Sequence, residues 1–366
     1  MLSLFEQLED PRVERTKRHK LIDIISITLC AVLCGCNDWE EIELFGKNKQ
    51  SWLRTFLELP NGIPSHDTIN RLFAALSPTS FEEVFLQWVA EVATLSEGRI
   101  ISIDGKRLCG SGVGGKKAVI HMVSAWCNLN NISLGQIKTE EKSNEITAIP
   151  KLLDMIVVKG CTVTIDAMGC QKEIASKIIE KEGDYLLALK GNQGHLLDDV
   201  QEAFEHTKPT AIETNITKPE KGHGRIEKRT CNIIRNIDWV CDAKEWKNLQ
   251  ALVQIKSERT IVTTGEKQTE TRYYISSSNA SALDMCNIVR SHWGIENKLH
   301  WSLDVSFNED NSRKMAGFAA ENFSTITKIA LGILKNDKSN KLSIKKKRMK
   351  AGWNEEFIEH LIFKKN

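Results

Sequence analysis

The sequence lacks the long apolar runs that would place it in a membrane or direct it out of the cell. Its most apolar stretch, Leu21 to Cys36, contains Asp23 and is about sixteen residues long, whereas a bilayer span needs roughly twenty apolar residues. Met1 to Lys20 is dense in charge and has no apolar segment of the kind that a secretion signal needs. These absences exclude a membrane protein and predict a buried helix over Leu21 to Cys36.

Proline, paired cysteines and excess charge are also scarce. Only 7 of the 366 residues are proline, 41% are hydrophobic and 27% are charged, which is the composition of a folded chain of about two or three domains. The 10 cysteines show no CxxC pairs, so we expect reduced thiols in a cytoplasmic protein and no zinc site built from cysteine. The net charge of +2 neither favours nor excludes nucleic acid, so any basic surface must be local.

The periodicity of the sequence divides the chain into five segments, with no internal repeat of fixed period. Residues 1–96 are mainly helical, and Ser65 is placed to cap a helix over Thr68 to Leu76. Residues 97–208 follow the order β-β-β-α-β-α-β, which predicts a mixed α/β sheet. Residues 209–280 resemble a β-rich insertion, residues 281–336 return to helix, and residues 337–366 form a basic tail.

A glycine-rich stretch, Gly110 to Lys117, matches GxGxxG and comes within one residue of a P-loop. Both motifs hold phosphate on the amides of a following helix, but the pattern here predicts another strand. Lys117 also occupies the place of the magnesium-binding Ser or Thr. We therefore predict a flexible hairpin loop and no nucleotide site.

Two aspartates occupy matching positions, because Asp104 and Asp166 each follow a hydrophobic run and precede a small residue. Such strand ends hold ligands in open α/β sheets, although a single Asp there is more often a turn former or a cap. His292, Glu296 and His300 are spaced i, i+4, i+8, which places them on one stripe of a helix. Three carboxylates from two strands and a helix could hold two divalent metals about 4 Å apart for phosphodiester chemistry. An alternative is a zinc hydrolase that uses the two histidines and Glu296, since imidazole favours zinc.

The order of the elements and three motifs closely resemble the DDE transposases of bacterial insertion sequences, in particular the H-repeat-associated group found beside Rhs elements. The three motifs are Ser102–Lys106, Thr164–Gln171 and His292–Asn297, supported by Ala188–Gln193, His223–Glu227 and Asp304–Asp310. The resemblance covers nearly the whole chain.

This resemblance implies an RNase H-like mixed-sheet catalytic core, interrupted by the β-rich insertion and preceded by the N-terminal helical domain. Asp104, Asp166 and Glu296 would be the metal-binding catalytic triad, with Mg²⁺ as the cofactor and Mn²⁺ as a substitute. The protein would cut the ends of its element and join them to target DNA. The alternative is a catalytically inactive, transposase-derived protein that only binds DNA.

The chain departs from a pattern of related insertion-sequence transposases, Y-x2-R-x3-E-x6-K around the last carboxylate. Val289, His292 and Leu303 fill the Tyr, Arg and Lys places. The triad survives this departure, whereas the case for a hairpin intermediate on the excised end is weakened.

The implied partner is double-stranded DNA, bound by a homodimer at the element ends and the target. Ser65 to Arg71 begins a helix that could enter a groove, although ordinary packing would explain it equally well. The cations expected to contact phosphates are Lys190, Arg225 and Lys298 near the metals and Lys345, Lys346, Lys347 and Arg348 in the basic tail.

Overall fold

The computed structural model describes residues 2–93, 99–112, 119–140, 144–222, 224–240 and 243–363. The chain forms two compact units, each assembled from separated segments. Unit 1 contains Met1–Leu95, Gly105–Glu141 and Glu296–Asn366, and unit 2 contains Ser96–Asp104 and Lys142–Ile295. Residues 113–118 of the glycine-rich stretch lie outside the described residues, so the loop expected there stays a prediction.

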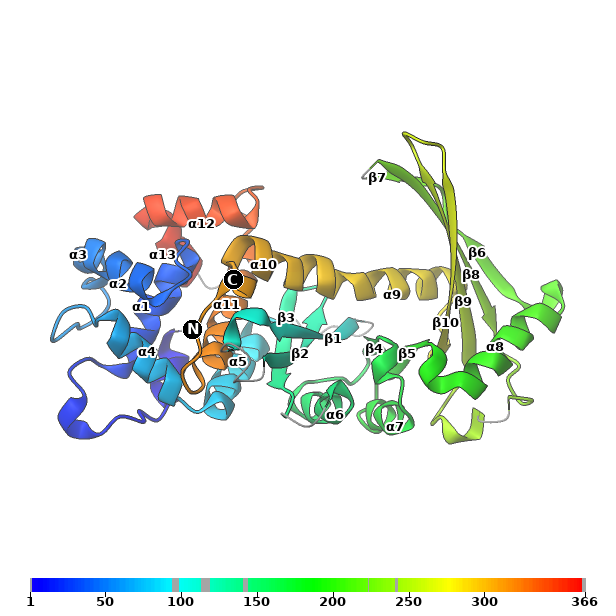
Figure 1. The fold of residues 1–366 in the computed structure, drawn as a ribbon, viewed down its shortest axis with the longest axis horizontal. Coiled ribbons are helices and arrows are strands. Elements are labelled where there is room, and N and C mark those ends of the chain that lie inside the picture. Colours follow the sequence, from blue (N-terminus) through cyan, green and yellow to red (C-terminus); the bar gives the residue numbers. More distant parts are fainter. Residues whose placement is uncertain are drawn as a thin grey trace. The chain divides into compact units, whose positions relative to one another are not determined.

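Unit 1 is mainly helical (Figure 1). Its N-terminal part contains α1 (Leu21–Leu33), α2 (Trp39–Asn48), α3 (Gln50–Leu53), α4 (His66–Ala75) and α5 (Pro78–Val92). Its C-terminal part contains α10 (Trp301–Phe307), α11 (Ala319–Asn336), α12 (Ile344–Trp353) and α13 (Glu355–Phe363). Between them lie the antiparallel strands β2 (Ile120–Cys127) and β3 (Ile132–Lys138). The helical periodicity of the N-terminal segment is thus confirmed.

Helix α11 is the centre of unit 1. It is buried along almost its whole length and contacts α1, α4, α5 and β3. Helix α1 is almost as deeply buried, as its apolar sequence predicts. Helix α4 begins at His66, two residues before the expected Thr68, and the cap at Ser65 is confirmed, because its hydroxyl accepts a hydrogen bond from the Thr68 amide at 3.3 Å. In none of the described ranges does a helix have the length and apolar character to cross a membrane.

Unit 2 combines the expected parallel strands with the β-rich insertion. The parallel strands are β1 (Ile100–Leu108, shared with unit 1), β4 (Thr162–Ile165) and β5 (Asp184–Leu189). They alternate with α6 (Glu145–Met155), α7 (Lys172–Glu180) and α8 (Gly194–His206). The insertion contains β6 (Glu213–Ile216), β7 (Glu220–Gly222), β8 (Arg225–Ile234), β9 (Ala251–Ile261) and β10 (Lys267–Ser276), so the β-type pattern read there is confirmed.

The strand order confirms the fold class expected from the sequence. In unit 2 the order is β1-β4-β5-β10-β9-β8-β6, with β7 on β8, and in unit 1 it is β3-β2-β1. The first five strands therefore follow the order 3-2-1-4-5 of an RNase H-like core. Since β10 pairs with β5, the insertion continues the core sheet.

The insertion also supports helix α9 (Ala282–Gly294), which leads toward Glu296. Met285, Ile288 and Val289 of α9 are buried in one apolar cluster with Ile233 of β8 and Val253 of β9. The helix contacts β8, β6 and β4, so the insertion fixes the course of α9.

Three insertion strands extend past the carboxyl ends of the core strands. Tyr273 of β10 lies opposite Leu189 at the end of β5, and Lys267 begins β10 six residues earlier. Arg225, the first residue of β8, pairs with Ile261 of β9, which is one position beyond Thr260, the partner of Lys267. At ~3.3 Å per residue, Arg225 is roughly 23 Å beyond the end of β5. The extension is visible near β7 in Figure 1.

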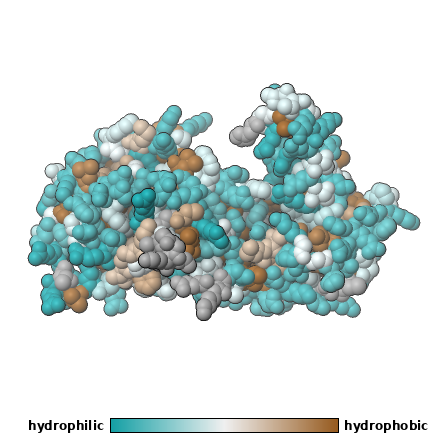
Figure 2. Space-filling view, viewed as in Figure 1, coloured by the Kyte–Doolittle hydropathy of each residue, from teal (hydrophilic) through white to brown (hydrophobic). Residues whose placement is uncertain are grey.

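The C-terminal segment differs from the basic tail expected from its charge. Residues 344–363 form α12 and α13, which pack against α11. Lys347 and Arg348 are buried in unit 1, whereas Lys345 and Lys346 are exposed. Figure 2 shows mostly hydrophilic residues on the visible surface, with small scattered apolar spots.

Candidate active site

Asp104 and Asp166 lie side by side on neighbouring parallel strands. Ile103 of β1 is in register with Ile165 of β4, so Asp104 and Asp166 follow at matching positions. Strand β4 ends at Ile165 as expected, whereas β1 continues through Asp104 to Leu108, contrary to the expectation that Asp104 closes its strand. Both side chains are half-buried. The structure thus confirms that the two aspartates lie at matching positions of two neighbouring strands in the central sheet.

The carboxylate of Asp166 is oriented by the backbone that follows it. Its Oδ1 accepts hydrogen bonds from the amides of Met168 at 3.1 Å and Gly169 at 3.4 Å. This turn is tightly packed, since a Cβ on Gly169 would lie 2.2 Å from Cγ2 of Ile165. The sequence motif after Asp166 therefore encodes a turn that fixes the direction of the carboxylate.

Two amide side chains hold the same turn from the next strand. The Asn192 side chain donates to the carbonyl of Ala167 at 2.7 Å, and the Gln193 side chain donates to the carbonyl of Cys170 at 2.9 Å. The resemblance drew attention to Ala188–Gln193 without giving it a role. The contacts show that its polar end supports the loop that carries Asp166.

A further carboxyl group, Glu145, was not identified from the sequence. It lies in the first turn of α6 with 8% of its surface exposed. Burial, followed by the charge of Asp166, raises the pKa of Glu145 to about 6. The sequence indicates a helix start at Asn144, because Asn is a common capping residue. The nearness of Glu145 to Asp166 is not visible in the sequence, because the two residues are 21 positions apart. Carboxylate oxygen is the ligand type that a hard divalent cation prefers, so the chemistry of Asp104, Asp166 and Glu145 suits such an ion.

The last turn of α9 is attached to the two strands that carry the aspartates. Ser102 donates from its hydroxyl to the carbonyl of Ser291 at 3.3 Å, and Thr164 Oγ1 lies 3.0 Å from Nδ1 of His292. Ser102 and Thr164 each precede an aspartate by two residues, and alternate strand residues point to the same face. The end of α9 therefore lies on the face to which Asp104 and Asp166 point.

His292 is held as a neutral imidazole at this position. Burial lowers its pKa, and the charge of Asp166 opposes that shift only in part. The hydrogen bond to Thr164 fixes the ring. His292, which stands where the Y-x2-R-x3-E-x6-K pattern has arginine, thus carries no permanent charge at neutral pH.

Glu296 follows in a wider helical turn. After α9 the chain continues as a π-helix, Ile295–His300, and then as α10. Glu296 is exposed and comes four residues after His292. Short π-helical turns are rare and frequently occur at functional sites. The helix through Trp301 was expected, whereas the wider turn has no sequence signature. Because Glu296 belongs to unit 1, its convergence with the aspartates stays a prediction.

The zinc hypothesis finds no support in the contacts of its two histidines. His300 is half-buried in unit 1, and its desolvation together with the charges of Lys328 and Lys106 lowers its pKa to about 3. Two ammonium groups near an imidazole disfavour another cation there. In unit 2, His292 is bonded to Thr164. Across the described ranges, no three His, Cys, Asp or Glu side chains are grouped closely enough to hold a metal ion.

The expected DNA-contacting cations separate into two groups. Lys190, Arg225, Lys298, Lys345 and Lys346 are exposed. Arg225 is remote from the aspartates, contrary to the expectation that it lies near the metals.

Lys347 and Arg348 cannot serve as phosphate ligands, because both are bonded inside unit 1. Lys347 donates to the carbonyls of Leu334 and Asp337 at 2.8 and 2.6 Å. Arg348 donates to the carbonyls of Val32 and Cys36 at 2.9 and 3.0 Å. The expectation for these two residues was wrong, because a charge run does not reveal which of its members find buried partners.

Aspartates at matching positions of neighbouring central strands, on an RNase H-like core, define a class of metal-dependent enzymes that cut and join phosphodiesters. Residues 95–333 match the family described as "Transposase DDE domain", and residues 2–89 match "DDE_Tnp_1-associated". The chain therefore belongs to the DDE transposase family, whose members act with divalent metal ions. Its function is DNA transposition, and the binding-only alternative is not favoured.

Curated relatives agree with this assignment. YncI of Escherichia coli O157:H7 is 43% identical over 371 residues, covering 99% of this chain and 94% of that protein. The H repeat-associated YhhI of Escherichia coli K12 is 42% identical over 351 residues, covering 94% of this chain and 92% of that protein. Both are named as transposases. A solved piggyBac transposase synaptic complex with hairpin DNA matches with a TM-score of 0.46 and 11% identity over 99% of this chain and 77% of that chain.

Proposed function

We propose that Asp104, Asp166 and Glu296 form the catalytic triad of this transposase and hold two Mg²⁺ ions, which Mn²⁺ can replace. One observation carries the proposal. Ser102 and Thr164 attach the last turn of α9 to the face on which both aspartates lie, and Glu296 follows one turn later. On this basis we expect the Glu296 carboxylate to face the two aspartates.

The residues of the chain have distinct roles in this proposal. Two hard cations held by the triad would activate the attacking oxygen and stabilise the leaving oxygen of a phosphodiester. Asp166 is pre-oriented by the amides of Met168 and Gly169, so little ordering is needed on binding. His292 keeps the end of α9 on β4.

Phosphate contacts are proposed for five exposed cations. Lys190 follows β5, whose carboxyl end shares the edge of Asp104 and Asp166, and suits a phosphate near the cut. Arg225 suits a phosphate farther along the duplex, since it is roughly 23 Å beyond β5 at ~3.3 Å per residue. Lys298, Lys345 and Lys346 complete the set. We infer that two copies of the chain hold the two element ends in the cytoplasm, at the nucleoid. Light scattering with and without end DNA tests the dimer.

The triad is tested with variants that keep side-chain size and remove charge: Asp104→Asn, Asp166→Asn and Glu296→Gln. Loss of residues that only support metal ligands costs about 10- to 100-fold, so each triad variant should lower cleavage by at least ~100-fold. The substrate is a labelled duplex containing the DNA that flanks the gene, with Mg²⁺ or Mn²⁺. Mn²⁺ binding, measured by calorimetry, should weaken in each variant, while duplex binding is retained.

Asp198→Asn is the matched control, because Asp198 is an exposed aspartate of α8 in unit 2. It should cleave and bind Mn²⁺ like the parent protein. Undiminished cleavage by the three triad variants would refute the assignment. Tight duplex binding by a parent protein that never cleaves would instead favour the inactive, binding-only protein.

A further inference from the structure

Strand β1 carries a second charged residue two positions after Asp104. The side chain of Lys106 is 13% exposed, and its ammonium contacts three carboxylates. Nζ lies 2.8 Å from Glu309 Oε2 and 3.6 Å from Asp310 Oδ1, and it also forms an ion pair with Asp304. We call these four residues the Lys106 cluster. All of them belong to unit 1.

The carboxylates of the Lys106 cluster come from the chain that follows Glu296. Asp304 lies in α10, which continues the π-helix of Glu296 without a break. Glu309 and Asp310 lie in the 3₁₀ turn Glu309–Asn311 just after α10. Lys106 therefore links β1, the strand that carries the proposed ligand Asp104, to the helical segment that follows the proposed ligand Glu296.

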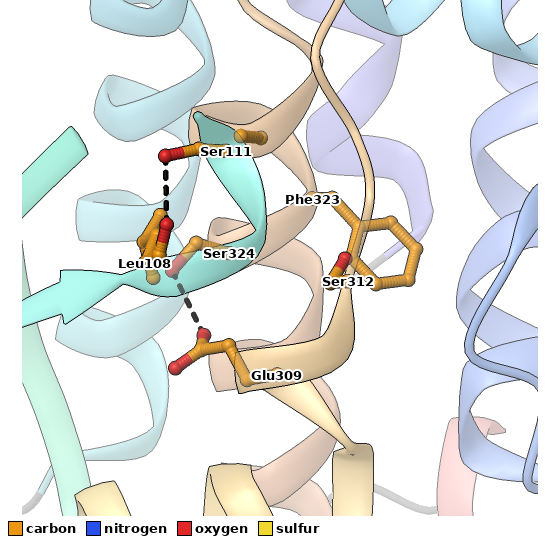
Figure 3. A pocket seen from close by; sticks show the side chains of 7 residues that line it. Leu108, Ser111, Glu309, Ser312, Phe323 and Ser324 are labelled. Carbon is orange, nitrogen blue, oxygen red and sulfur yellow. Dashed lines mark hydrogen bonds between the residues drawn. The ribbon is translucent and has the colours of Figure 1, made fainter. Parts of the chain in front are cut away.

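Glu309 is also fixed from its other side. Its Oε1 accepts a hydrogen bond from the Ser324 hydroxyl of α11 at 3.4 Å (Figure 3). A cavity of about 20 Å³, which has room for about one water, is lined by Glu309 and the hydroxyl-bearing Ser111, Ser312 and Ser324. Only 8% of Glu309 is exposed, so loss of the lysine would leave a buried carboxylate without its ion partner. The Lys106 cluster is thus a fixed contact between β1 and the segment after Glu296, and not a loosely held ion pair on the surface.

We propose that Lys106 is a positioning residue of the transposase reaction, which holds the helical segment after Glu296 against β1, two residues beyond Asp104. The proposal rests on the triad proposed above. Catalytic groups must be held within about 0.5 Å of their productive geometry, and a shift of about 1 Å can cost ~100-fold in rate. Burial of Leu299, Leu303 and Phe307 packs the segment beyond Glu296 into unit 1, and the Lys106 cluster adds the charged contact that fixes this segment directly to β1.

The test compares Lys106→Met with a matched control, Lys138→Met. Lys138 of β3 forms an ion pair with Glu321 of α11 at 2.9 Å, so it too joins a strand to a helix in unit 1, but away from the segment after Glu296. Hydrogen–deuterium exchange of residues 296–310 should rise at least ~10-fold in Lys106→Met and stay unchanged in Lys138→Met.

Cleavage provides the second measurement. Lys106→Met should cleave the flanking-DNA duplex at least ~10-fold more slowly and need more Mn²⁺ for half-maximal rate, with duplex affinity unchanged. Lys106→Arg, which keeps the charge, should recover part of the rate. The double variant Lys106→Met with Asp304→Asn should cleave as fast as Lys106→Met alone, because both substitutions break the same contact between β1 and α10.

A merely stabilising role would lower the folded fraction of Lys106→Met but leave the half-saturating Mn²⁺ concentration as in the parent. That result, or unchanged exchange in residues 296–310, overturns the proposal. If Lys106→Met does not fold, Asp304→Asn must show the same exchange and Mn²⁺ changes. Failure of the triad itself is read separately, from the variants of Asp104, Asp166 and Glu296.

Discussion

The buried pair of Asp337 and Lys347 allows a quantitative prediction about how α12 and α13 are held. Their charged groups are 3.0 Å apart, with the side chains 2% and 5% exposed. Burial alone would raise the pKa of Asp337, but hydrogen bonds from Ser339 and Lys347 hold it at about 2, below the ordinary value of 3.8. His360 of α13 lies 3.2 Å from the same carboxylate.

The lowered pKa of Asp337 determines how its contribution to stability changes with pH. The folded state favours the ionised carboxylate, so the contribution is fully present above a pH of about 4 and is lost as the pH falls toward 2. A difference of nearly two pKa units corresponds to about 2 kcal/mol. Asp337→Asn should therefore increase the opening of α12 and α13 about 30-fold at pH 7.

Hydrogen–deuterium exchange of residues 344–363 at pH 7 measures this opening, with the exposed Asp198→Asn as the control. Urea unfolding should show the penalty of Asp337→Asn at pH 6 and a smaller one at pH 3. An equal penalty at both pH values would show that the ionisation of Asp337 contributes nothing and would refute the reasoning.

Two other predictions concern packing and thiol access. Gly169→Ala should lower the unfolding free energy by about 1–3 kcal/mol, because its Cβ would overlap Ile165, whereas Gly191→Ala, with nothing within 4 Å, should not; thermal unfolding compares them. Maleimide should label Cys109, which is exposed, far faster than Cys30, which is buried and whose pKa burial raises. Loss of a fast-labelled peptide in Cys109→Ser, read by mass spectrometry, checks this, and an equally fast Cys30 would contradict it.

The sequence predicted best what depends on short-range pattern. The neighbouring positions of Asp104 and Asp166 follow from two similar apolar runs, although β1 continues past Asp104 to Leu108. The cap at Ser65 follows from local hydrogen bonding. The β-type alternation of residues 209–280 also reports which faces are buried.

The features that escaped prediction depend on partners far away in the chain. Two of the carbonyls that bind Arg348, those of Val32 and Cys36, belong to residues more than 300 positions earlier, and the carboxylates that contact Lys106 lie about 200 positions later. Neither the type of a charged residue nor its neighbours in sequence encode such contacts. The nearness of Glu145 to Asp166 was missed for the same reason.

The π-helix around Glu296 constrains how the gene can change. Each helical residue turns the chain by about 100°, so removal of one codon between Glu296 and Trp301 would convert the wide turn to an ordinary one and swing Asp304 away from Lys106. The interval of eight residues from Glu296 to Asp304 is therefore fixed in length as well as in composition. The exposed turn Val262–Glu266, which joins β9 to β10, is under no such constraint on its length. Insertions and deletions among descendants of this gene should therefore be found mainly in this turn.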